Sequence, residues 1–268
     1  MPNNYLLVVE GANDEKNILQ SVFEKYGFNV IKCEEKISVE SYGEFNKYEL
    51  KSENDNVVII EGPRNRIHDF LISFDTEYEA IEKLFHYSAY HFSGIFLIYD
   101  VDHNDNEDVD IMFNKFNNES DGLLLLNSPC LEVLADTNVD ENKELKFNHL
   151  KEYKKSLNKY HNLNGNENSV KYITNHFNEI MMHFLEKNKK EFNESNIMEH
   201  PRLVKNKINL DNERVNYKNK DDSYVIFRYF TTVLYVAIAY TNKLTNEIDN
   251  YEIVHSFFEN KMNENQST

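Results

Sequence analysis

Two stretches of the sequence decide the predicted fold: YLLVVEGANDE, from Tyr5 to Glu15, and IFLIYDVDHND, from Ile95 to Asp105. In each stretch an apolar run typical of a buried strand ends in acidic residues. Two such strands in one sheet would bring their carboxylates to the same edge, where open α/β sheets place their chemistry. Oxygen-rich clusters of this kind bind Mg²⁺ or Mn²⁺. The predicted cluster consists of Glu10, Asp14, Asp100 and Asp102.

A third stretch follows the same rule. The segment LLLLNSPCLEVL, from Leu123 to Leu134, is another apolar run, and it leads into Ser-Pro-Cys-x-Glu. If this run is a strand of the same sheet, it adds Glu132 to the candidate metal ligands.

Together these motifs resemble the Toprim domain, which topoisomerases, bacterial primases and the OLD-family nucleases share. The resemblance rests on Glu-Gly after the first strand, on Asp-x-Asp at Asp100 to Asp102, and on a Ser-Pro-Cys-x-Glu segment similar to one in RloB-like Toprim proteins. It implies that Asp100 and Asp102 hold metal and that Glu10 is a metal ligand or a general acid/base. OLD-type nucleases place a carboxylate for a second metal ion near the position of Asp14.

The order of the elements predicts an α/β fold with a largely parallel sheet flanked by helices. We expect this Toprim-like domain over residues 1–140 and a mainly helical C-terminal domain over 141–268. The predicted strands are Tyr5–Val9, Asn29–Cys33, Val57–Ile60, Ile95–Tyr99 and Leu123–Leu126, and the predicted helices are Asp14–Tyr26, closed by Gly27, Glu77–His91 and Val109–Phe116.

The second half of the chain lacks a regular alternation of strands and helices. Asn162 to Asn168 is the clearest break, and Ser169 to Asn188 carries an apolar helical stripe. Ser223 to Tyr240 is apolar on nearly every face, and as a helix it would need cover from a helical domain or a second subunit. We therefore expect this half to mediate assembly, as a homodimer or with a protein partner such as an ATPase sensor.

The formal net charge of −17 is unusual for a protein that acts on nucleic acid. Metal ions would offset part of the excess. Most of it lies in three acidic stretches typical of solvated loops and helix faces, which are Glu34 to Glu53, Asp102 to Asp110 and Asp136 to Glu144. Basic residues that could contact phosphate are few, and each also fits an exposed structural role. They are Arg64 and Arg66 after the third strand, and Arg202, Lys205 and Lys207 in the helical half.

Several candidate residues also have a structural interpretation. Acids such as Asp14 and Glu132 suit the first turn of a helix whatever their function, and the Asp pair with its neighbours His103 and Asp105 suits a turn. Two cysteines, Cys33 and Cys130, are too few and too far apart for a disulfide framework, and we expect both to be small buried hydrophobes.

The function that these features predict is that of a Mg²⁺- or Mn²⁺-dependent endonuclease on DNA or RNA, tRNA included. The resemblance implies an effector of anti-phage defence. Two alternatives stay open: a catalytically silent Toprim-fold module that binds a protein partner, and a nucleotide phosphotransferase or hydrolase. No apolar run is long enough to cross a bilayer and no export leader is apparent, so we expect a cytoplasmic protein without a membrane partner.

Overall fold

The structure is a computed structural model. It describes residues 3–10, 14–39, 43–62, 92–100, 111–114, 116–118, 122–128, 130–135, 145–147, 152–153, 155–156, 169–194, 225–227, 230–231, 233–245 and 251–266. The chain divides into two compact units. The first comprises residues 1–99 and 107–125, and the second 100–106 and 126–268. The predicted domain boundary near residue 140 lies outside the described residues.

Three parallel strands form the centre of the main sheet. They are β1 (Asn3–Glu10), β4 (Asp55–Gly62) and β5 (Phe92–Asp100), and β1 lies between the other two. Their interior residues are buried almost throughout, which explains why each strand reads as a continuous apolar run. The predicted strands Tyr5–Val9, Val57–Ile60 and Ile95–Tyr99 are confirmed.

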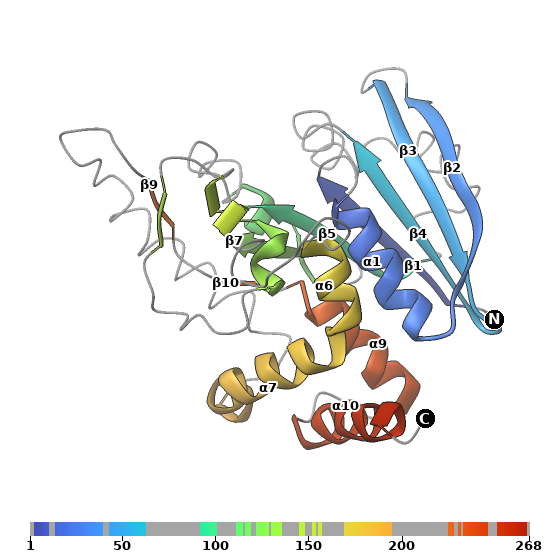
Figure 1. The fold of residues 1–268 in the computed structure, drawn as a ribbon. Coiled ribbons are helices and arrows are strands. Elements are labelled where there is room, and N and C mark those ends of the chain that lie inside the picture. Colours follow the sequence, from blue (N-terminus) through green and yellow to red (C-terminus); the bar gives the residue numbers. More distant parts are fainter. Residues whose placement is uncertain are drawn as a thin grey trace. The chain divides into compact units, whose positions relative to one another are not determined.

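An antiparallel hairpin extends this sheet on the β4 side (Figure 1). Its strands are β2 (Asn29–Val39) and β3 (Gly43–Lys51), and β3 also pairs with β4. The prediction of solvated loops and helix faces from Glu34 to Glu53 is therefore wrong. The charged residues there stand between apolar side chains that the sheet buries, Phe45, Tyr48 and Leu50 among them.

The sheet as a whole is mixed, so the expectation of a largely parallel sheet holds only for its centre. The strand order is β10-β7-β5-β1-β4-β3-β2, with β7 over Gly122–Ser128 and β10 over Phe230–Thr231. β6 (Asn117–Asn118) and β10 each pair antiparallel with β7. The predicted strand Leu123–Leu126 is confirmed as part of β7.

One helix of the first unit follows β1 directly. This is α1 (Asp14–Lys25), and its buried residues are Ile18, Leu19, Val22 and Phe23. Gly27 has φ of +87°, a conformation that glycine adopts without strain, and Phe28 N–H donates to the Phe23 carbonyl over 3.2 Å. The predicted helix and its glycine stop are confirmed. The predicted helix over 109–116 is described only at residues 111–114, and Glu77–His91 lies outside the described residues.

The second unit is mainly helical. It contains the 3₁₀ helix η2 (Leu131–Ala135) and the helices α6 (Ser169–Asn175), α7 (Phe177–Glu194), α9 (Tyr235–Thr245) and α10 (Tyr251–Gln266). Edge-to-face ring pairs join α7 to α10 through Phe177 and Phe258, and α7 to α9 through Phe184 and Tyr235. The predicted stripe from Ser169 to Asn188 is confirmed, with a break between α6 and α7 at His176.

The predicted apolar helix from Ser223 to Tyr240 is wrong in its first half. Val225–Phe227 forms β9, which pairs with β8 (Leu145–Phe147), and β10 follows before α9 begins at Tyr235. Aromatic and β-branched residues dominate this segment, and they favour strands over helices. None of the described helices is long and apolar enough to span a membrane.

Candidate functional site

Two neighbouring strands of the sheet end in carboxylates. β1 ends at Glu10 and β5 ends at Asp100, and the parallel register places Val9 opposite Ile98. The strands therefore terminate within about one residue step of each other, roughly 3.3 Å along the strand direction. This is the carboxyl edge at which the sequence predicts the acidic cluster.

The same register assigns the side chains to faces. Residues opposite each other in a sheet project from the same face, and successive residues of a strand alternate. Because Val9 lies opposite Glu61 on β4 and Ile98 on β5, Glu61 belongs to the face of Val9, and Glu10 belongs to the other face. Continued alternation along β5 assigns Asp100 to the face of Ile98. Glu10 and Asp100 therefore end adjacent strands but belong to opposite faces of the sheet.

Glu61 is a carboxylate that the sequence analysis missed. It is the penultimate residue of β4, and only 3% of its surface is exposed. The hydroxyl of Tyr48 on β3 donates a hydrogen bond to Glu61 Oε2, with 3.2 Å between the two oxygens. Lys16 Nζ on α1 lies 4.7 Å from the centre of the Tyr48 ring. A signal for it exists in the sequence, because β1 and β4 both end an apolar run with Glu-Gly, at Glu10 and at Glu61.

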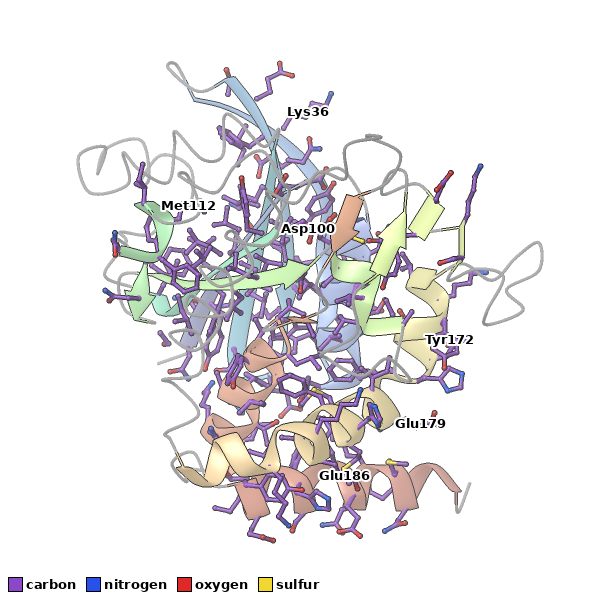
Figure 2. The ribbon with its side chains drawn as sticks, turned by 90° about the vertical axis from the view of Figure 1, so that its left-hand side faces the viewer. Lys36, Asp100, Met112, Tyr172, Glu179 and Glu186 are labelled. Carbon is purple, nitrogen blue, oxygen red and sulfur yellow. The ribbon has the colours of Figure 1, made fainter. Side chains whose placement is uncertain are left out.

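Within the second unit, Asp100 is held by a hydrogen bond from β7. Asn127 Nδ2 donates to Asp100 Oδ1 over 3.2 Å, and Thr231 Oγ1 on β10 donates to Asn127 Oδ1 over 2.7 Å. Asn127 is completely buried. Asp100, the last residue of β5, is labelled in Figure 2. Neither Asn127 nor Thr231 was among the predicted site residues, because an amide and a hydroxyl carry no signal of chemistry by themselves.

Glu132 and Cys130 lie together in the segment that follows β7. Glu132 stands in the first turn of η2 and is 2% exposed, so its carboxylate is removed from solvent. Cys130 is fully buried and is a free thiol. Its predicted role as a small buried hydrophobe is consistent with this position, because a nucleophile needs access to its substrate.

Several predicted residues lie outside the described part of the chain. These are the side chains of Asp14 and Cys33, and the residues Asp102, His103, Asp105, Arg64, Arg66, Arg202, Lys205 and Lys207. Within the described residues, no three His, Cys, Asp or Glu side chains are grouped so that they could hold a metal ion. The predicted five-carboxylate cluster thus stays a prediction.

The donor chemistry at the edge nevertheless suits a hard divalent cation. Carboxylate oxygens are the ligands that Mg²⁺ prefers, and Mg²⁺ is commonly bound by one or two carboxylates together with water and substrate phosphate. Glu10 at the end of β1 and Asp100 at the end of β5 each carry a side chain of this type.

No protein-family model matches the chain, and no curated protein matches it either.

Proposed function

We propose that this chain is a metal-dependent endonuclease that hydrolyses phosphodiester bonds in DNA or RNA, with Mg²⁺ or Mn²⁺ as its cofactor. One observation carries the proposal: the adjacent parallel strands β1 and β5 end in Glu10 and Asp100 at the same sheet edge, in a register that differs by about one residue. Ligands and catalytic groups of open α/β sheets gather at this edge.

In this proposal Asp100 and Asp102 hold the cation, and Glu10 is a further ligand or the group that transfers a proton. A bound divalent ion would supply Lewis acidity and a water of lowered pKa. Asp14 and Glu132 are proposed as additional ligands. The role as an effector of anti-phage defence follows from the Toprim resemblance.

The net charge of the protein affects how strongly it binds a nucleic-acid substrate. With a formal net charge of −17, the long-range field repels phosphate, so isolated protein should bind nucleic acid weakly. We propose that the C-terminal half mediates assembly, as a homodimer or with a partner such as an ATPase, and that assembly raises activity. Light scattering with titration of labelled DNA and RNA at low salt tests this. A monomer that binds and cuts tightly would contradict it.

The activity itself is tested with a panel of substrates. Purified full-length protein is incubated with plasmid, single-stranded DNA and total tRNA, each with Mg²⁺, Mn²⁺ or a chelator. The expected result is cleavage of at least one substrate with metal and none with chelator. A nucleoside triphosphate control distinguishes a nuclease from a nucleotide hydrolase. If every condition leaves all of these substrates intact even at high protein concentration, the catalytically silent interaction module becomes the better account.

A further inference from the structure

Asp100 stands at the end of a chain of hydrogen bonds within the second unit. The backbone N–H of Val233 donates to Thr231 Oγ1 over 3.4 Å, and this hydroxyl donates to Asn127 Oδ1 over 2.7 Å. The Asn127 amide then donates to Asp100 Oδ1 over 3.2 Å. Every donor in the chain points toward the carboxylate. Hydrogen bonds aligned in this way polarise one another, so the last donor is strengthened by those behind it.

The chemistry of the groups fixes the orientation of the Asn127 amide. An ionised carboxylate only accepts hydrogen bonds, so the nitrogen of the amide must face Asp100. The amide oxygen then faces Thr231, whose hydroxyl can both donate to it and accept from a backbone N–H. The roles of all the partners are therefore consistent, and exchanging the amide's oxygen and nitrogen would place an oxygen against the Asp100 carboxylate and remove that hydrogen bond.

The surroundings hold this chain of groups in place. Asn127 is fully buried, and Thr231 lies opposite it in the antiparallel pair of β7 and β10. β10 is only two residues long, and Phe230 opposite Ser128 is its other paired position. With two paired residues, β10 adds few backbone hydrogen bonds to the sheet. The feature of β10 that bears on Asp100 is the hydrogen bond from the Thr231 hydroxyl to Asn127.

We propose that Asn127 and Thr231 are positioning residues that hold the Asp100 carboxylate in one orientation for metal binding. The inference rests on the proposed function, because it takes Asp100 as a metal ligand. Groups that hydrogen-bond a ligating carboxylate reduce its freedom before the ion arrives, and removing such a group typically weakens metal binding by about 10–100-fold. The orientation of the Asp100 carboxylate would thus depend on a threonine more than a hundred residues after β7. This threonine lies in a segment that the sequence analysis assigns to the helical half.

The test compares threonine variants by their affinity for Mn²⁺ alone, measured by calorimetry and by the electron paramagnetic resonance of free Mn²⁺. Thr231→Val keeps the shape and removes the hydroxyl, and it should weaken binding about 10–100-fold. Thr231→Ser restores the hydroxyl and should bind nearly as the wild type does. Thr174→Val is the matched control, because Thr174 is also partly buried and its hydroxyl donates to the Val170 carbonyl of its own helix. It should leave Mn²⁺ affinity unchanged.

Two outcomes separate this inference from the proposed function. If Asp100→Asn abolishes Mn²⁺ binding while Thr231→Val binds as tightly as the wild type, Asp100 is a ligand and the positioning role is wrong. If Asp100→Asn binds Mn²⁺ as the wild type does, both the ligand assignment and the positioning role are wrong. Circular dichroism confirms folding of each variant. Thr231→Ala, which removes the hydroxyl without crowding the site, replaces Thr231→Val if that variant does not fold.

Discussion

Tyr48 on β3 donates a hydrogen bond to the buried carboxylate of Glu61 on β4, with 3.2 Å between the two oxygens. A hydrogen bond to a buried charged group contributes more than one to a neutral group, so Tyr48→Phe should lower the free energy of unfolding by about 1–3 kcal/mol. Urea denaturation measures this.

A double-mutant cycle attributes that loss to the pair. In Glu61→Gln the carboxylate charge is absent, so Tyr48→Phe should cost less in this background than in the wild type. Equal costs in the two backgrounds would show that the Tyr48 hydroxyl acts through other contacts.

The proposed ligands should contribute to activity without contributing to stability. Glu10→Gln, Asp100→Asn and Asp102→Asn each keep the shape of the side chain and remove its charge, so each should abolish cleavage. Loss of one charge from a group of repelling carboxylates should leave the melting temperature of the metal-free protein unchanged or raise it. Thermal unfolding with chelator measures this. A large drop in melting temperature for all three would indicate structural roles instead.

The segment after β7 offers a contrast between two buried side chains. Cys130→Ala should cost on the order of 1–2 kcal/mol of stability, since it removes a small buried group, and should preserve cleavage. Glu132→Gln should impair metal-dependent cleavage if this carboxylate joins the site. Wild-type cleavage rates in Glu132→Gln would confine the ligands to the first two motifs, and lost cleavage in folded Cys130→Ala would point to a thiol nucleophile.

The stability of the helical region should depend on pH through the hydroxyl of Tyr251 on α10. Burial raises the pKa of the Tyr251 hydroxyl above its ordinary value of 10.0, and the carboxylates of Glu186 on α7 (Figure 2) and Glu252 raise it further. The folded state therefore binds this proton more tightly than the unfolded state does. Its contribution to stability is complete below the unfolded pKa of about 10 and is lost as the pH rises toward the folded pKa.

Tyr251→Phe removes this titration. Urea denaturation between about pH 8 and pH 11 should show a smaller loss of stability in Tyr251→Phe than in the wild type. Parallel losses in the two proteins would contradict the raised pKa of Tyr251.

The centre of the sheet could be predicted from the sequence because its strands are buried on both faces. Such strands read as unbroken apolar runs, as at Tyr5–Val9 and Ile95–Tyr99. The hairpin of β2 and β3 could not be predicted so directly, because charged residues occur between its buried positions. Lys47 is an example: it is 3% exposed although lysine is rarely buried, and it forms an ion pair with Glu49, two residues further along the same strand.

The candidate site shows the same limit. The positions of Glu10 and Asp100 at the ends of strands could be predicted because each carboxylate ends an apolar run, and Glu61 carries the same signal. Asn127 and Thr231 are different, since their hydrogen bond depends on a pairing between strands about a hundred residues apart. No local pattern encodes such a partner. The first half of Ser223–Tyr240 was misassigned because hydrophobicity alone does not distinguish a buried helix from successive short strands.

The most direct test of the central claim is a cleavage assay with Mg²⁺ on the substrate that the panel selects. It compares the wild type, Asp100→Asn and Glu53→Gln, the last of which changes an exposed carboxylate in the turn between β3 and β4. The account predicts cleavage by the wild type and Glu53→Gln, and none by folded Asp100→Asn. Full activity of Asp100→Asn with Mg²⁺ would contradict the assignment of a metal-dependent nuclease site to the end of β5.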